Sequence, residues 1–201
     1  DRFSKKFLVN NVARRQSEFS SHFPSVLFTP EDLEIITDTP SLRRNYVNSV
    51  LSQTDKKYKL AVSIYEKALR HRNRMLYLMR EGKKHYGEAE FEYWDNILIN
   101  NGGIITALRE AFVKYINGHE KEVFPFEIFY DKSTITTERL EKYHDAERAT
   151  AQTLVGPNRD DFFFLFPSSS RHSERSEESK TKRFISEFGS RGEQRLTIFQ
   201  M

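Results

Sequence analysis

Apolar residues recur at helical spacing through the middle of the chain. Between Asp55 and Lys84 the stripe steps by four and three residues, which is typical of helices that pack along their length. Its members are Ala61, Tyr65, Ala68, Met75 and Met79. Arg72 falls on the same stripe, between Ala68 and Met75. The pattern predicts one long helix that carries a charged residue on its packing face.

A second long stretch, Ala89 to Ile116, has the same periodicity and predicts a second helix. Its apolar positions are Trp94, Leu98, Ile105, Leu108, Phe112 and Tyr115. Gly102-Gly103 lies in the middle of this stretch, and each glycine weakens a helix by about 1 kcal/mol. We therefore expect a kink or a break at these glycines. Asn117-Gly118 predicts the C-terminal end of the helix.

Shorter patterns flank these two helices. Thr39-Pro40-Ser41 begins a helix, because proline is tolerated in a first helical turn, and Thr136-Thr137-Glu138 opens a charged helix that reaches about Thr150. A short polar helix is predicted over 14–23. Runs of β-branched and aromatic residues predict strands at 5–9 before a turn at Asn10-Asn11, and at 25–28, 123–130, 153–155, 161–166 and 184–185. The serine-rich segment 168–182 is interpreted as a solvated, disordered loop.

The order of these elements is strands, then a block of helices, then strands again. A helical block inserted into an α/β framework produces that order. We therefore predict an α/β fold in which residues 1–38 and 151–201 contribute to one lobe. Residues 39–150 form a mostly helical inserted lobe with a strand near 123–130.

Composition narrows the class of protein only slightly. The 201 residues include no cysteine, which excludes disulfides and thiol chemistry and fits the cytoplasm. The net charge of +3 permits nucleic-acid binding without requiring it. No apolar run reaches the roughly 18 residues of a membrane span, and we do not expect the protein to bind a membrane. The chain begins at Asp1 without a methionine, so we interpret it as an internal fragment of a longer protein.

The segment Gly189-Ser190-Arg191-Gly192-Glu193-Gln194-Arg195 is the first candidate site. Glycine lets a backbone approach a ligand closely, and a helix start attracts phosphate through its unpaired N–H groups and its dipole. The Ser190 hydroxyl adds a donor. Serine followed by glutamate three residues later is also an ordinary capping box, so both readings stay open. We expect the helix itself to open at about Arg195.

Basic residues supply a second candidate site. Lys67, Arg70 and Arg74 share one face of the first long helix with His71. They form either a ridge against DNA phosphates or a solvated face. Arg72 either extends its charged end past the apolar stripe or forms a buried ion pair, for which we consider Asp160 and Asp161.

Five stretches, by their order and spacing, resemble the RecF family of ABC/SMC-type ATPases, and the resemblance extends over nearly the whole chain except 168–182. They are Val26 to Leu33, Ser41 to Val47, Ala68 to Leu76, Thr153 to Asp161, and Ser190 to Gln194. The resemblance implies an ABC-type ATPase lobe with an inserted helical lobe. It also implies ATP with Mg²⁺ as cofactors, an ATP-dependent homodimer, and binding to single-stranded or gapped duplex DNA with RecO and RecR as partners in repair.

The same resemblance assigns roles to residues of this chain. Ser190, Gly192, Glu193 and Gln194 match the signature motif, which contacts the γ-phosphate of ATP held by the other subunit. Arg159, Asp160 and Asp161 form an interface or site loop after a Gly-Pro turn; the alternative is an ordinary charged turn. Arg43 and Arg44 are further DNA-binding candidates. No metal ligand and no catalytic residue is assigned.

Three departures from the family pattern stand out. The chain has no G-x-x-x-x-G-K-[ST] sequence, so the phosphate-cradling loop is absent from these residues. We also expect the acidic strand of the family, which binds Mg²⁺ and activates water, to lie beyond these residues, and we therefore expect the chain alone not to hydrolyse ATP. The third departure is segment 168–182, where the family has a short hairpin. A smaller difference is Asn158, where the family usually has histidine. A non-catalytic helical scaffold that binds DNA or protein is the alternative function.

Overall fold

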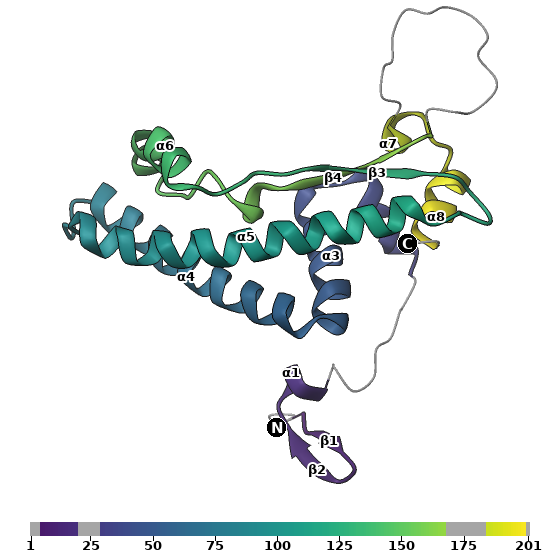
Figure 1. The fold of residues 1–201 in the computed structure, drawn as a ribbon, viewed down its shortest axis with the longest axis horizontal. Coiled ribbons are helices and arrows are strands. Elements are labelled where there is room, and N and C mark those ends of the chain that lie inside the picture. Colours follow the sequence, from purple (N-terminus) through teal and green to yellow (C-terminus); the bar gives the residue numbers. More distant parts are fainter. Residues whose placement is uncertain (1–4, 20–28, 168–183, 200–201) are drawn as a thin grey trace, which may run out of the picture.

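The computed structural model describes residues 5–19, 29–167 and 184–199 (Figure 1). Within them the structure is rich in helix and has two antiparallel pairs of strands. The helical elements are α1 Gln16–Phe19, the 3-10 helix η1 Pro30–Leu33, α2 Glu34–Thr37, α3 Pro40–Thr54, α4 Lys56–Arg80, α5 Glu88–Gly118, α6 Thr137–Thr150, the 3-10 helix η2 Pro157–Arg159, α7 Ile185–Phe188 and α8 Arg191–Phe199. The strands are β1 Phe7–Val9, β2 Val12–Arg14, β3 Glu127–Asp131 and β4 Asp161–Leu165.

Two long antiparallel helices, α4 and α5, dominate the arrangement (Figure 1). The Asp55 side chain accepts a hydrogen bond from the Tyr58 N–H at 2.9 Å and caps α4. The apolar stripe of α4 is buried against α5, with Tyr58, Ala61 and Ala68 almost inaccessible. The predicted long helix is confirmed, and it ends at Arg80, four residues earlier than expected.

The break expected at Gly102-Gly103 is wrong, because α5 runs unbroken from Glu88 to Gly118. Gly102 is buried where side chains of α4, of η2 and of the connection between β3 and α6 approach the helix. A Cβ atom at Gly102 would lie 2.5 Å from Ile135 Cγ2. Close packing rather than flexibility accounts for this glycine, and the helix ends at Gly118 as predicted.

The β3–β4 ribbon lies along α5 (Figure 1). Its register pairs Glu127 with Leu165 and Asp131 with Asp161. Aromatic residues from both strands stack across the ribbon: the Tyr130 and Phe162 rings are 4.8 Å apart and almost parallel. The predicted strand over 161–166 is confirmed, and that over 123–130 is corrected to Glu127–Asp131 because Pro125 has no N–H to donate.

The strand predicted over 153–155 is absent from the structure. Its backbone N–H groups are bonded by side chains instead of by a neighbouring strand: Thr153 N–H donates to Asn73 Oδ1 at 2.8 Å and Leu154 N–H to Glu147 Oε1 at 2.7 Å. Gly156 N–H donates to the hydroxyl oxygen of Ser133 at 3.2 Å. The segment is therefore an extended connection between α6 and η2.

The remaining short elements agree with the sequence in part. β1 and β2 form a hairpin whose turn residues, Asn10 and Asn11, both have positive φ angles. The expected helix over 14–23 is present at Gln16–Phe19, and its later part lies outside the described residues. Phe184 forms one bridge to Leu165 before α7 begins. The strand predicted over 25–28 and the segment 168–182 lie outside the described residues.

Candidate functional site

The signature-like motif forms the first turn of α8. Ser190 precedes the helix, and its hydroxyl oxygen accepts a hydrogen bond from Glu193 N–H at 3.3 Å. The Glu193 carboxylate accepts from Ser190 N–H at 2.7 Å in return. This reciprocal pair is a capping box, and because of it the helix begins at Arg191 instead of at the expected Arg195.

Ser190 and Gly192 remain exposed at this helix start, whereas Gln194 is buried. The Gln194 amide donates to the carbonyl of Gly189 at 3.2 Å and fixes the approach of the chain to the helix. A Cβ atom at Gly189 would lie 2.6 Å from the Ile185 carbonyl oxygen, so glycine is needed there. The first backbone N–H groups of a helix have no intrahelical partner. Capping and anion binding are therefore compatible at this helix start.

A buried carboxylate, Asp160, is the centre of the turn that follows η2. Its Oδ2 atom receives a hydrogen bond from Arg109 Nη1 at 2.6 Å and one from the Tyr130 hydroxyl. Its Oδ1 atom accepts from Ser133 N–H at 2.7 Å. Burial raises the pKa of Asp160, and Arg109 and these hydrogen bonds oppose that rise. Because its three donors come from α5, from β3 and from the backbone that follows β3, the Asp160 carboxylate holds the turn against both elements.

Arg109 links the turn to α3 and α4. Besides Asp160, it donates to the Pro157 carbonyl at 2.9 Å, to the Tyr58 hydroxyl at 3.0 Å and to Asn48 Oδ1 at 2.9 Å. A pocket of about 180 Å³ opens beside this guanidinium, between α3, α4, α5 and η2. Sequence reasoning missed Arg109. Its position among Ile105, Leu108 and Phe112 is the same signal that singled out Arg72.

Arg43 and Asp161 form a second ion pair beside Asp160. The Arg43 guanidinium donates to both carboxylate oxygens of Asp161, at 2.7 and 3.0 Å, and to the Asp38 carbonyl at 2.7 Å. Arg43 is buried, so the geometry gives it a packing role and does not support the predicted DNA contact. Arg44 is half-buried and donates to the Asp160 carbonyl at 2.9 Å. Burial and the neighbouring Arg109 lower the pKa of Arg44.

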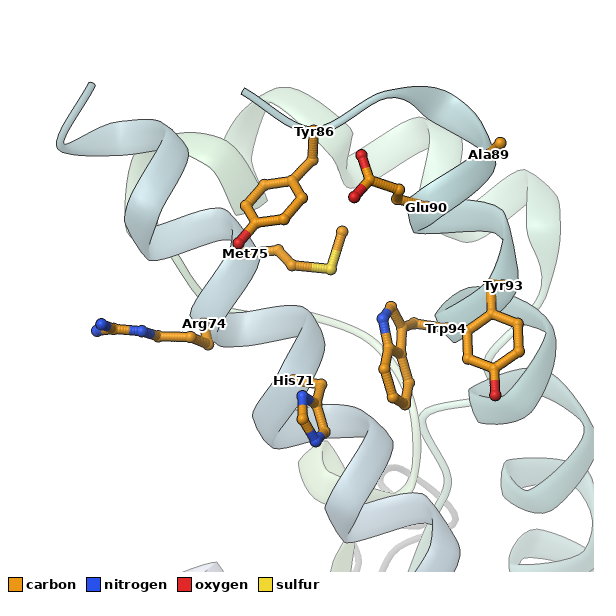
Figure 2. A pocket seen from close by; sticks show the side chains of 8 residues that line it. All are labelled: His71, Arg74, Met75, Tyr86, Ala89, Glu90, Tyr93 and Trp94. Carbon is orange, nitrogen blue, oxygen red and sulfur yellow. The ribbon is translucent and has the colours of Figure 1, made fainter. Parts of the chain in front are cut away.

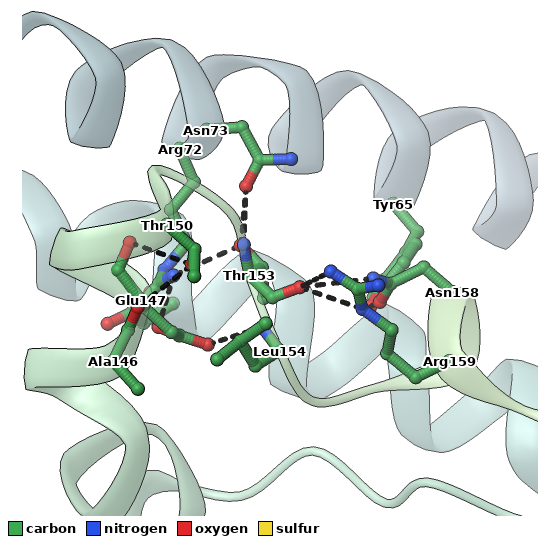
Figure 3. Close-up of polar contacts among 11 residues, drawn as sticks. Tyr65, Arg72, Asn73, Ala146, Glu147, Thr150, Thr153, Leu154, Asn158 and Arg159 are labelled. Atoms are coloured by element: carbon green, nitrogen blue, oxygen red, sulfur yellow. Dashed lines mark hydrogen bonds and ion pairs between the residues drawn. The ribbon is translucent and has the colours of Figure 1, made fainter.

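Arg72 forms the buried ion pair that the sequence left open, but with other partners than Asp160 and Asp161 (Figure 3). Its guanidinium lies 2.7 Å from Glu147 Oε2 and 2.5 Å from Asp95 Oδ1. Glu147 is completely buried. Because α4, α5 and α6 each supply one charge, the network fixes α6 against the long helices. Asp160 and Asp161 are already paired with Arg109 and Arg43.

Arg159, the residue before Asp160, lies at the surface of the turn formed by η2 (Figure 3). Its guanidinium donates twice to the Thr153 carbonyl, at 3.1 and 2.9 Å, and closes the loop on itself. Tyr65 reaches the turn from α4 and donates its hydroxyl to Asn158 Oδ1 at 2.6 Å. Burial raises the pKa of Tyr65 and of Tyr130 far above the usual value for a phenol.

The predicted basic face of α4 is exposed along its length. Lys67, Arg70 and Arg74 are all solvent-accessible, and Arg70 lies 3.9 Å from Glu66 in an exposed pair. Arg74 lies over the Tyr77 ring at 5.3 Å. All three lie exposed on α4, whereas Arg43 and Arg44 lie at the ion-paired turn around Asp160.

The described residues contain no group of three or more histidine, aspartate or glutamate side chains that could hold a metal ion. None of the described helices combines the length and the apolar character that a membrane span requires.

The fold and the motif order together define a segment of an ABC-type ATPase lobe with helices inserted into it. The chain is related to RecF proteins, with which it shares sequence and fold over about half of their length. "DNA replication and repair protein RecF" of Herpetosiphon aurantiacus is 29% identical over 98% of this chain and 51% of the relative. The protein of the same name from a Thermoanaerobacter species is 31% identical over 79% of this chain and 49% of the relative.

Solved structures give the same result. The recombination mediator protein RecF in the RecFOR pathway, solved as RecF-ATPrS, aligns with a TM-score of 0.80 and 26% identity over 98% of this chain and 54% of that chain. The corresponding RecF-ATP structure aligns with a TM-score of 0.78 over 94% and 52%. No protein-family model matches the chain.

Proposed function

We propose that this chain is the part of a RecF-type ATPase that contributes the signature motif to ATP held by a second subunit. The observation that carries the proposal is the match of nearly the whole chain to RecF structures solved with ATP and ATPrS. The capped, exposed start of α8 supports it, because Ser190 and Gly192 face solvent where a second subunit can approach.

In this proposal the motif of Ser190, Gly192, Glu193 and Gln194 meets the γ-phosphate across a dimer interface, and the exposed Ser190 and Gly192 make the contact. The hydroxyl of Ser190 and the N–H groups of the first turn stabilise phosphate charge by position alone. Glu193 keeps the cap in shape, and buried Gln194 holds the incoming chain. Mg²⁺ accompanies ATP, with its ligands outside this set. Arg159, Asp160 and Asp161 belong to a loop that the ion pairs keep rigid near the interface.

The whole protein would bind DNA in replication and recombinational repair. The name and the pathway of the relatives support this role, and the exposed cations of α4 give it a physical basis. We propose gapped or single-stranded DNA as substrate, RecO and RecR as partners, and the cytoplasm as location. Residues 1–38 and 151–201 would belong to the ATPase lobe, and residues 39–150 to the helical lobe.

A non-catalytic scaffold is the second candidate function. The prominence of α4 and α5, with basic residues along one face, favours it (Figure 1). One observation distinguishes the ATPase from the scaffold. A phosphate-binding loop encoded ahead of residue 1 favours the ATPase, and a coding sequence without that loop favours the scaffold.

The dimer proposal is tested with a full-length chimera, in which this chain replaces the matching half of the Herpetosiphon aurantiacus RecF. Ser190→Arg should abolish dimer formation with ATP and leave nucleotide binding by the monomer unchanged, because the arginine would block the partner's phosphate. Dimer mass is measured by light scattering, and ATP binding by fluorescence of a labelled nucleotide. Ser63→Arg, at an exposed serine of α4, is the matched control. ATP-driven dimers of the Ser190→Arg chimera would contradict the in-trans role.

A further inference from the structure

A pocket lies between α4 and α5, near the loop that joins them (Figure 2). Its volume is about 430 Å³, within the roughly 300–1,000 Å³ range of small-molecule sites. Aromatic side chains dominate the lining: Tyr86 from the loop, and Tyr93 and Trp94 from α5. Met75 lies between Tyr86 and Trp94 in the view of Figure 2. No role has been given to these residues by the proposed ATP chemistry.

The aromatic groups already form a partial stack. The His71 ring lies 4.5 Å from the Trp94 ring, and the two planes differ by 7°. Tyr93 meets Trp94 edge-on at 5.0 Å. His71 already covers one face of Trp94, so another flat group with polar edges would enter on the side of the pocket that Tyr86 and Tyr93 line. Nucleobases fit that description, and each base that stacks on an aromatic side chain contributes appreciably to single-strand binding.

Charge around the pocket discriminates between possible occupants. The α4 side and the loop are basic: Arg74 lines the pocket and points outward in Figure 2, and Lys84 lies 4.3 Å above the Tyr86 ring. Among the described residues, no carboxylate lies within ion-pair distance of Arg74 or Lys84. These free cations can bind phosphate, whereas they would repel the basic side chain of a partner protein.

The opposite wall supplies an acceptor. Glu90 lines the pocket, and its Oε2 atom accepts from Gly87 N–H at 3.0 Å in the cap of α5. Its other carboxylate oxygen can accept a base N–H, as carboxylates do from cytosine. Glu88 and Glu92 make this end of α5 acidic, so phosphate is confined to the α4 side. A nucleotide matches both walls: its base faces Glu90 and its phosphate faces Arg74.

We propose that the pocket formed by His71, Arg74, Tyr86, Glu90, Tyr93 and Trp94 binds an unpaired base of single-stranded DNA. The proposal rests on the DNA-binding function proposed above, and it names the site and the strand state that this function recognises. Lys67 and Arg70 lie about two turns and one turn before Arg74 on the same exposed face of α4, so a strand bound along this face would reach Arg74 at the edge of the pocket.

Trp94 is the single tryptophan of the chain, which makes the test direct. Single-stranded 12-mers of DNA are titrated into the 201-residue chain while its tryptophan fluorescence is recorded. Stacking of a base should quench the emission in a saturable manner. Tyr86→Ala should weaken binding about tenfold, the order expected for one lost stacking contact. Arg74→Gln should weaken binding and lower the salt slope by about 0.7. Tyr115→Ala, an exposed aromatic at the far end of α5, should change neither.

A parallel titration with blunt-ended duplex DNA distinguishes failure of the pocket proposal from failure of the proposed DNA-binding function. Duplex binding measured by anisotropy, with unquenched Trp94 for both DNA forms, would overturn the pocket proposal and leave the DNA-binding function standing. If neither DNA form binds to chain whose helicity is intact by circular dichroism, both proposals fail for these residues. Saturable quenching by an arginine-rich peptide, with no response to the 12-mers, would also overturn the nucleotide proposal and indicate a protein partner.

Discussion

At the scale of single residues, two buried arginines determine how the parts are joined. Arg72 and Arg109 both lie on the packing faces of long helices; Arg72 pairs with two carboxylates, and Arg109 pairs with one carboxylate and several neutral acceptors. Replacing one partner of a buried pair leaves the other charge without compensation, which typically costs about 3–5 kcal/mol. These residues therefore contribute more to the stability of the structure than exposed pairs such as Arg70–Glu66.

Arg109→Met should lower the free energy of unfolding by about 3–5 kcal/mol. The reason is that Asp160, completely buried, would lose its cation. Urea unfolding followed by circular dichroism measures the change, and Arg70→Met is the exposed control, for which we expect less than about 1 kcal/mol. Equal effects of the two substitutions would show that the Asp160 network contributes no special stability.

At the scale of elements, the two neighbouring glycines of α5 have opposite environments. A Cβ atom at Gly102 would come within 2.5 Å of Ile135 and 3.3 Å of Tyr65, whereas a Cβ atom at Gly103 would meet nothing within 4 Å. Gly102 is therefore required by packing. Gly103 only reduces the helix propensity.

Gly103→Ala should raise the free energy of unfolding by up to about 1 kcal/mol, because alanine favours the helix. Gly102→Ala should lower it, since the same gain is outweighed by the displacement of Ile135. Thermal unfolding of the two variants gives the comparison directly. Stabilisation by both substitutions would mean that the contact with Ile135 relaxes without cost.

The sequence predicts the long elements well for a physical reason. The apolar periodicity of α4 and α5, the Asp55 and Thr136 caps and the Gly118 stop are local signals, and the helices follow them. The strand predicted at 153–155 is wrong because its N–H groups are bonded by the side chains of Asn73, 80 residues from Thr153, and Glu147, in the preceding helix. Pairing choices of this kind have no local signature, and the partners of Arg72 were missed for the same reason.

The sequence also predicts those features of the candidate site that depend on local patterns. The cap at Ser190 and the exposure of the α4 cations follow from local patterns, namely serine–glutamate spacing and helical phase. The engagement of Arg43 with Asp161 joins residues 118 positions apart, so no periodicity could reveal it. The nucleotide role of Ser190 stays a prediction.

At the scale of the whole molecule, the basic face of α4 is exposed on one side of the long helices. If it follows a phosphate backbone, each lost contact removes about 0.9 from the salt slope on duplex DNA. Replacing Lys67, Arg70 and Arg74 by glutamine in the full-length chimera should lower DNA affinity and reduce the slope by up to about three. The reduction should be similar for different sequences, because phosphate contacts carry no base information.

DNA affinity is measured against salt concentration, with circular dichroism as the check on folding. The matched control replaces three exposed lysines outside this face, Lys114, Lys132 and Lys142, by glutamine. An unchanged slope in the α4 variant would identify the face as ordinary solvated surface.

The hydrogen bonds of the connection from Thr153 to Gly156 limit which substitutions the protein can tolerate during evolution. Its backbone donors are satisfied by Asn73, Glu147 and Ser133, one from each of three separate parts of the chain. A substitution that removes the acceptor oxygen at any of these positions leaves a main-chain N–H group without its present partner, which is costly when the group is buried. Tolerated changes must therefore arrive in compensating combinations, and this short connection should accept fewer independent substitutions than its lack of regular structure suggests.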